Sequence, residues 1–206
     1  MLEKVIVSFA AIKLNAATMK SKCFQIGNER QLISCDFQQA IELTRNPDAK
    51  IWIDVQGIET DELEELLDTL EVKDLARRLC KDARERSGFY PLNAYIFLVI
   101  PVKAATERNV EYITILCRKN FFLTLREARD TRIQKITNFD EASDWLQDNS
   151  IEGLLATLMM ILSLVSLQQL SGLRDLITKI EGQMDREPEA IVLSELSEMR
   201  SELLTL

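Results

Sequence analysis

Apolar runs separated by polar turn residues predict strands in the first part of the chain. Three runs rich in β-branched and aromatic residues have this form: Val5–Phe9, Lys22–Ile26 and Ile51–Val55. Between the second and third runs, Asp36 is placed to cap a helix that continues from Phe37 to Leu43 with apolar residues at helical spacing. The pattern therefore predicts three strands, with a helix between the last two.

From Glu59 to Leu79 the apolar residues recur at three- and four-residue intervals, which predicts two consecutive short helices. Thr60 or Asp61 is placed to cap the first of them. The polar positions of this segment are mainly acidic: Glu59, Asp61, Glu62, Glu64, Glu65, Asp68, Glu71 and Asp74. Such a surface attracts cations, although a run of like charges is more often a solvated helix face. We favour the solvated face and keep cation attraction as the alternative.

The central part of the chain predicts an antiparallel meander. Tyr95–Ile100 is apolar on both faces of a strand, and Val110–Leu116 and Phe121–Leu125 follow it. Arg118–Asn120 forms a tight connection between the last two strands. The segment Arg86–Pro91, which contains a glycine and ends in a proline, is expected to be the loop that leads into the meander.

Helical spacing dominates the last third of the chain. Residues 129–148 predict one or two short helices, and the apolar spacing then continues from Ile151 to Asp185 without a proline, which predicts one long helix. Pro188 interrupts the pattern, and residues 190–206 resume it. The chain is therefore expected to turn near Arg186–Glu189 and to return as an antiparallel helix.

These elements predict an α/β fold class. A mixed sheet layered with helices occupies residues 1–150, a usual size for a domain, and a long antiparallel helical hairpin occupies residues 151–206. The helical pattern stops inside the second helix of the hairpin without a capping residue or a glycine. We therefore expect this chain to be a domain excised from a longer protein.

The segment Gly153–Leu173 has no charged residue over about the length that a membrane helix requires, roughly 20 residues. Polar residues interrupt the segment, which favours a helix packed against protein over a membrane span. Apolar residues extend beyond the main stripe at Met159, Met160, Leu164 and Leu167. We expect these four side chains to contact another subunit or to fold back against the α/β layer, because together they would otherwise form an unusually large exposed apolar patch.

Composition narrows the possible functions. Lys and Arg total 25 against 33 Asp and Glu, and the net charge of −8 argues against a nucleic-acid-binding surface. The absence of histidine excludes Ser/His, Cys/His and His-ligated metal chemistry. The six glycines are too widely spaced for a phosphate-binding loop. The four cysteines, Cys23, Cys35, Cys80 and Cys117, form no CxxC pair, which favours reduced thiols over zinc ligands.

Several sequence strings together resemble one family in their order and spacing. They are Ile51–Val55 before an acidic helix, the aromatic-aliphatic strand Ala94–Ile100, the strand pair within Val110–Leu125, Gly153–Leu158 at the start of the long helix, and Arg186–Glu189 at its far turn. Over about Lys50 to Leu203, the chain resembles the cytoplasmic domain of the CorA family of divalent metal ion transporters.

This resemblance implies a soluble cytoplasmic domain, regulatory or structural, of a magnesium or cobalt ion transporter whose pore-forming part is absent from the sequence. It implies that the full-length protein is a homopentamer on the cytoplasmic side of the cell membrane, which it enters only through segments beyond Leu206. It also implies that a divalent cation binds between subunits and closes the channel when bound. No enzymatic activity is expected from such a domain.

The positions that the resemblance assigns to metal ligands carry other residue types in this chain. The metal-sensing acidic pair falls at Arg78 and Leu79, and the acids of the first long helix fall at Met160, Leu164 and Val165. None of these side chains offers the oxygen that a hard cation requires. We therefore predict no metal-ligating residue, no catalytic residue and no tightly bound cofactor, with weak Mg²⁺ or Co²⁺ binding at the acidic surface at most.

Two alternatives from other functional classes stay open. A free-standing cytosolic protein-interaction module would bind its partners through the acidic helix at 59–74 and the apolar long helix. An enzyme would need two carboxylates from among Asp54, Asp82 and Glu111 in a pocket that raises one pKa, and the sequence indicates no such pocket. Two apolar helices joined by Gly-Met-Asn and encoded beyond Leu206 would distinguish a transporter from the interaction module.

Overall fold

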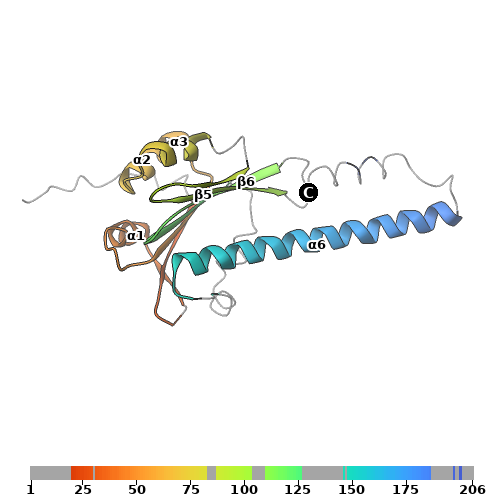
Figure 1. Cartoon of the computed structure of the whole chain (residues 1–206), viewed down its shortest axis with the longest axis horizontal. Helices are drawn as coiled ribbons and strands as arrows, with labels where there is room; N and C mark the ends of the chain where they lie inside the picture. The colour runs from red at the N-terminus through yellow and green to blue at the C-terminus, as the bar shows by residue number, and fades with distance from the viewer. Residues whose placement is uncertain are drawn as a thin grey trace, which may run out of the picture.

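Figure 1 shows the computed structural model, in which helices lie on both faces of a sheet. The structure describes residues 20–29, 31–82, 87–103, 110–126, 146, 148–186, 197 and 200. Three predicted segments fall wholly or mostly outside these residues: the strand Val5–Phe9, the helices at 129–148 and the returning helix at 190–206. The remaining predicted elements can be compared with the structure directly.

The seven described strands form one mixed sheet in the order β2-β1-β3-β7-β6-β5-β4. Their bounds are β1 Lys20–Ile26, β2 Leu32–Cys35, β3 Ile51–Gln56, β4 Gly88–Pro91, β5 Ile96–Lys103, β6 Val110–Arg118 and β7 Phe121–Arg126. Within this sheet β3 and β7 are parallel, and the other neighbouring strands are antiparallel. The predicted meander of β5, β6 and β7 is confirmed, with the turn Lys119–Asn120 between its last two strands.

The two outer strands are the elements that the sequence pattern did not predict. β4 lies in the segment 86–91, so the prediction of a loop there is wrong for Gly88–Pro91. Proline is compatible with this strand because β4 is an edge strand and Pro91 is its last residue, where no ladder hydrogen bond is lost. β2 is a four-residue edge strand that pairs only with β1 and has no long apolar run to signal it.

The helices form one layer on each face of the sheet (Figure 1). Helices α1 (Phe37–Leu43), α2 (Thr60–Thr69) and α3 (Asp74–Asp82) cover one face, and α6 (Ile151–Arg186) covers the other. Alternate residues of β3 point to the two layers, since Ile53 belongs to the core under α1–α3 and Trp52 to the core under α6. The mixed sheet layered with helices is confirmed, and the long helix ends one residue beyond its predicted end.

Two helix starts show where local sequence rules succeed and fail. Asp36 caps α1 as predicted, and its carboxylate accepts a hydrogen bond from the backbone N–H of Gln39 at 2.8 Å. The cap of α2 is Glu59, so the prediction of Thr60 or Asp61 is wrong. The shift has a physical cause, because the carboxylate of Glu62 reaches back to accept a hydrogen bond from the backbone N–H of Glu59 at 3.2 Å.

A sharp turn separates α2 from α3. The backbone N–H of Val72 donates to the carbonyl of Leu67 at 2.8 Å, and that of Glu71 donates to the carbonyl of Asp68 at 3.0 Å. This pair of bonds is the Schellman arrangement that ends many helices. Glu71 adopts the left-handed conformation, with φ 54°, at a position that usually belongs to glycine. The turn folds α3 back beside α2.

The start of α6 is attached to the sheet by polar contacts. The hydroxyl of Ser150 accepts a hydrogen bond from the N–H of Gly153 at 2.9 Å and so caps the helix. The Lys50 ammonium, directly before β3, donates to the carbonyl of Asn149, and the Asn149 amide donates to the carbonyl of Asn28 beyond β1. These contacts fix where α6 leaves the sheet.

A buried polar network joins the two parallel strands. The carboxylate of Asp54 on β3 accepts three hydrogen bonds from Arg126 on β7. Arg126 Nε donates to Oδ1 at 3.0 Å and to Oδ2 at 3.2 Å, and a terminal nitrogen donates to Oδ2 at 2.8 Å. The Thr124 hydroxyl donates to Asp54 Oδ1 at 2.8 Å and accepts from the indole N–H of Trp52 at 3.1 Å. All four residues are buried, so each polar group relies on the others in place of water.

We predict that Arg126→Met lowers the free energy of unfolding by about 3–5 kcal/mol, because it leaves the Asp54 carboxylate buried without its cation. Denaturant titration measures the change, and Arg78→Met serves as the control because Arg78 is exposed on α3. The double variant Asp54→Leu, Arg126→Met should recover part of the loss, because it removes both charges. A single-variant loss no greater than that of the control would contradict the assignment.

Candidate functional site

One face of α6 packs on the sheet. Ile151, Leu154, Leu158 and Leu162 are buried, and they share a core with residues of β1, β3, β6 and β7. Their three- and four-residue spacing places them on one side of the helix. The first third of α6 is therefore held against protein along its apolar stripe.

A second apolar stripe of α6 is exposed. Its members are Met159, Leu164, Leu167 and Leu170, with 36, 41, 58 and 47% of their surface accessible, and the half-buried Met160 lies next to them. We call these five residues the free apolar stripe. The exposure of Leu164 and Leu167 shows that the expected folding back of these two side chains against the α/β layer is wrong. Contact with another subunit is the expectation that remains.

The length and composition of α6 are also those of a membrane-crossing helix. By these two criteria alone, Ile151–Gly182 is the one such helix among the described residues. The packing of Leu154 and Leu158 against the sheet explains part of this apolar character, since those side chains belong to a protein core. The free apolar stripe accounts for much of the rest.

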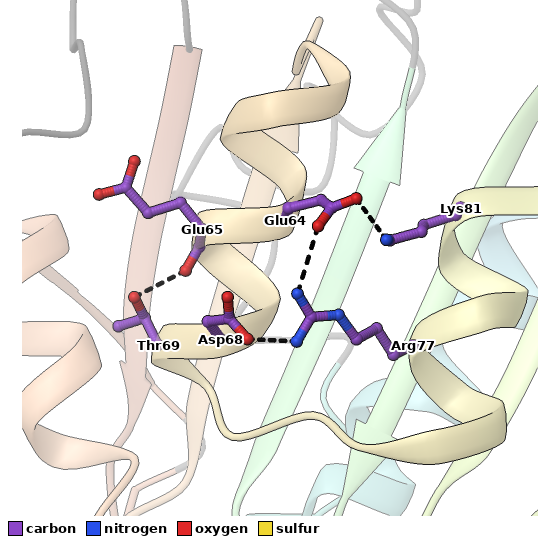
Figure 2. A network of polar contacts seen from close by, with 6 residues as sticks. All are labelled: Glu64, Glu65, Asp68, Thr69, Arg77 and Lys81. Carbon is purple, nitrogen blue, oxygen red and sulfur yellow. Dashed lines mark hydrogen bonds and ion pairs between the residues drawn. The ribbon is translucent and has the colours of Figure 1, made fainter.

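The acidic face of α2 is neutralised in part by α3, as Figure 2 shows. Arg77 donates to the carboxylates of Asp68 and Glu64, the latter at 3.4 Å, and Lys81 donates to Glu64. The carboxylate of Glu65 points away from both cations (Figure 2). Sequence reasoning did not find these pairs, because they depend on the turn that brings α3 beside α2.

The ion pairs favour the charged form of two carboxylates of α2, Glu64 and Asp68. The hydrogen bond and charge of Lys81, with those of Arg77, lower the pKa of Glu64. The hydrogen bond from Arg77 lowers the pKa of Asp68. Both side chains lie at the surface, where solvent screens such pairs and limits their value to stability. The acids that the sequence suggested as a cation-attracting surface therefore already have protein cations as partners at two of the eight positions.

A small pocket lies where α6 begins. It has a volume of about 200 Å³ and is bounded by the β4–β5 connection, the β6–β7 turn and the first turn of α6. Tyr95 and Leu155 supply apolar walls, whereas Arg118, Lys119 and Glu152 supply the charges. One carboxylate beside two cationic side chains is a poor environment for a divalent metal ion. Among the described residues, no group of three or more acidic or cysteine side chains is arranged to hold a metal.

Of the three carboxylates considered for an enzyme, the two described ones, Asp54 and Asp82, do not form a catalytic pair. Asp54 lies inside the sheet with its two oxygens bound by Arg126, and Asp82 is exposed at the end of α3. Glu111 belongs to β6, but its side chain is outside the described part of the structure. Asp54 therefore contributes to the core, and the geometry gives no support to the proposed acid/base pair.

The family model of the CorA-like Mg²⁺ transporter protein matches residues 48–206, which includes every element from β3 to α6. The chain belongs to the CorA-like Mg²⁺ transporter family. No curated protein matches its sequence.

Solved structures with the same fold support this assignment of architecture. Full-length CmaX has a TM-score of 0.75 and 12% identity, with 90% of this CorA-like chain and 58% of that chain covered. The soluble domain of CorA from Methanocaldococcus jannaschii has a TM-score of 0.57 and 14% identity, with 90% and 72% covered. The ZntB cytoplasmic domain from Vibrio parahaemolyticus has a TM-score of 0.64 and 14% identity, with 91% and 72% covered. The CorA-like chain thus spans little more than half the length of full-length CmaX.

The structure also places the positions that the family resemblance assigned to metal ligands. Arg78 is exposed on α3 and Leu79 is half-buried against the core below it. Met160, Leu164 and Val165 all lie on α6, and Met160 and Leu164 belong to the free apolar stripe. The CorA-like chain has apolar surface on α6 where the resemblance placed acids, so this surface is suited to protein contact.

We predict that the chain self-associates through the free apolar stripe and that Leu164→Glu weakens the association. Because Leu164 is exposed in the single chain, the substitution should leave the melting temperature of the dilute, monomeric chain nearly unchanged. Light scattering over a range of protein concentrations measures the mass. Gln168→Glu is the matched control, because it adds the same charge at an exposed polar position of the same helix. A monomer mass at every concentration of the unsubstituted chain would contradict the prediction.

Proposed function

We propose that this chain is the soluble cytoplasmic domain, regulatory or structural, of a CorA-like transporter that carries magnesium or cobalt ions. The observation that carries the proposal is the family match from β3 through α6. The likeness in fold to CorA, CmaX and ZntB chains supports it, since it covers the sheet and the long helix together. The chemistry of such a domain is binding and movement, and no enzymatic step is assigned to it.

In this proposal the full-length protein is a homopentamer, and this domain lies on the cytoplasmic side of the membrane. The free apolar stripe supports the assembly part of the proposal, because water-exposed Leu164, Leu167 and Leu170 lie along one helix and are available to a neighbouring subunit. The buried stripe of α6 keeps that helix on its own sheet. One side of α6 thus packs on the sheet of its own domain, and the other side is available to a neighbouring subunit.

Uptake of divalent cations tests the proposed transport function. The complete reading frame that contains these 206 codons would be expressed, and its product reconstituted in liposomes loaded with a magnesium-sensitive dye. We expect Mg²⁺ or Co²⁺ added outside to enter these vesicles faster than protein-free vesicles. A product that binds other proteins but produces no cation flux would instead support the free-standing interaction module.

We further propose that the domain itself binds Mg²⁺ and Co²⁺ only weakly and without selectivity. The positions equivalent to family ligands carry no oxygen ligands, and Glu64 and Asp68 are paired with Arg77 and Lys81. Dispersed surface carboxylates attract cations through a field that salt screens within about 10 Å. Any gating of the full-length protein by cytosolic metal would then depend on other residues.

Calorimetric titration at physiological salt measures this binding. We predict no saturable heat with millimolar Mg²⁺ and a similar result with Co²⁺, because no site in the described part of the chain provides the several oxygen ligands that these ions require. Glu65→Gln, which removes a carboxylate that points away from Arg77 and Lys81, should change the titration little. A saturable site that disappears when one particular carboxylate is replaced would contradict the proposal and leave the transport test unaffected.

A further inference from the structure

Two of the four cysteines face each other across the edge of the sheet. Cys23 on β1 and Cys35 on β2 are direct partners in the antiparallel register. Directly opposed residues in antiparallel strands have Cα atoms about 4.5–5.5 Å apart and side chains on the same face. A disulfide needs Cα atoms separated by about 4.4–6.8 Å. The backbone therefore places the Cα atoms of these two cysteines within the range that a disulfide requires.

The two thiols differ in access. Cys23 is buried in the core beneath α1–α3, with 3% of its surface accessible. Cys35 is half-buried against the same core and is the last residue of the edge strand β2. A small oxidant can therefore reach Cys35 first, with Cys23 immediately behind it. This arrangement supplies one accessible thiol and one protected thiol that can complete a disulfide.

The other two cysteines have no such arrangement. Cys80 is buried in α3, and Cys117 is buried on β6, where its register partners are Ile96 and Phe122. All four thiols are free in the structure. Cys80 and Cys117 therefore serve as internal references for the reactivity of isolated buried thiols.

We propose that Cys23 and Cys35 form a redox modification site that closes a disulfide between β1 and β2 when it meets a small-molecule disulfide such as oxidised glutathione. The thiolate of Cys35 attacks one glutathione sulfur, forms a mixed disulfide and releases the first glutathione thiolate. Cys23 then loses its proton, attacks the Cys35 sulfur and releases the second glutathione. Two protein thiols are oxidised to one disulfide, and one glutathione disulfide is reduced to two thiols.

Burial and nearby carboxylates control the rate of this reaction through the pKa values of the two thiols. Burial and the carboxylate of Asp36 raise the pKa of Cys35. Burial, followed by Cys35 itself and the nearby carboxylates, raises the pKa of Cys23 to about 12. Since the thiolate is the nucleophile, the rate should rise about tenfold per pH unit from neutral pH upward. Such a site stays reduced under ordinary cytosolic conditions and responds to sustained oxidation.

Oxidation would restrain the edge strand β2 and the start of α1. Cys35 directly precedes Asp36, the residue that caps α1. A covalent bond from Cys35 to β1 would tie both the edge strand and the start of α1 to the body of the sheet. The site is independent of the proposed transport function, because it depends only on the register of β1 and β2.

Peptide mapping of the folded protein tests the site. The chain is incubated with oxidised glutathione, its remaining thiols are alkylated, and it is digested with trypsin. Cleavage after Lys22, Arg30 and Arg45 places Cys23 and Cys35 on adjacent separate peptides, and Cys80 and Cys117 fall on two others. We expect the peptides 23–30 and 31–45 to be joined, with the mass of two hydrogen atoms lost, while Cys80 and Cys117 are not linked.

Two variants sharpen the test. Cys35→Ser should abolish the linked peptide and also the rise in melting temperature that oxidation gives the unsubstituted chain. Asp36→Asn keeps a good helix cap but removes the negative charge, so it should speed disulfide formation several-fold at neutral pH. A linked peptide found only in denaturant, glutathione that remains on Cys35, or four thiols that stay unmodified would each overturn the proposal.

Discussion

The parallel pairing of β3 with β7 is the constraint on which the domain depends. It joins two antiparallel halves, β2-β1-β3 and β7-β6-β5-β4, which meet at no other strand pair of the described sheet. Parallel strands cannot be connected by a tight turn, so the chain between them must travel through α2, α3 and three further strands before it returns. The pairing is therefore established late along the sequence, between segments about 70 residues apart.

The two helical layers reinforce the same junction. Trp52 and Phe122 lie side by side on β3 and β7. Their ring centroids are 6.3 Å apart in an edge-to-face arrangement beneath α6. On the other face, Ile53 and Leu123 occupy the corresponding position beneath α1–α3. The Asp54–Arg126 pair adds directional bonds to a seam that is otherwise apolar. Apolar burial supplies most of the cohesion here, while the ion pair selects one register of the two strands.

Much of the fold could be predicted because long apolar runs identify their own elements. The meander and α6 have such runs, whereas the edge strands β2 and β4 bury too little to produce one. The hydrophobic pattern of the sequence could not predict which elements contact each other. Leu154 and Leu164 are both leucines of α6. Leu154 is buried because it faces the sheet, and Leu164 is exposed because it does not. The pairing of Glu64 with Lys81 likewise depends on a turn that places Glu71 in an unusual conformation.

The fold and the chemistry of its surface follow different rules. The sheet and the long helix need apolar residues at regular intervals, a condition that many sequences satisfy, and relatives of only 12–14% identity share the architecture. A hard cation needs particular oxygen atoms at particular positions. The five positions that the resemblance assigned to metal ligands carry no carboxylate in this chain: Arg78, Leu79, Met160, Leu164 and Val165. The sequence could therefore indicate the family and still predict that the usual ligands are missing.

Among the described residues, α6 packs into the core of the sheet from Ile151 to Leu162, and this attachment near one end gives the helix mechanical leverage. Its 36 residues extend about 54 Å, and Figure 1 shows the helix continuing well past the edge of the sheet. A tilt of about 10° at the Ser150 end would displace the far end by about 9 Å, given that length. A small change in the hydrogen bonds that join Lys50, Asn149 and Asn28 would therefore produce a large displacement of the far end of α6.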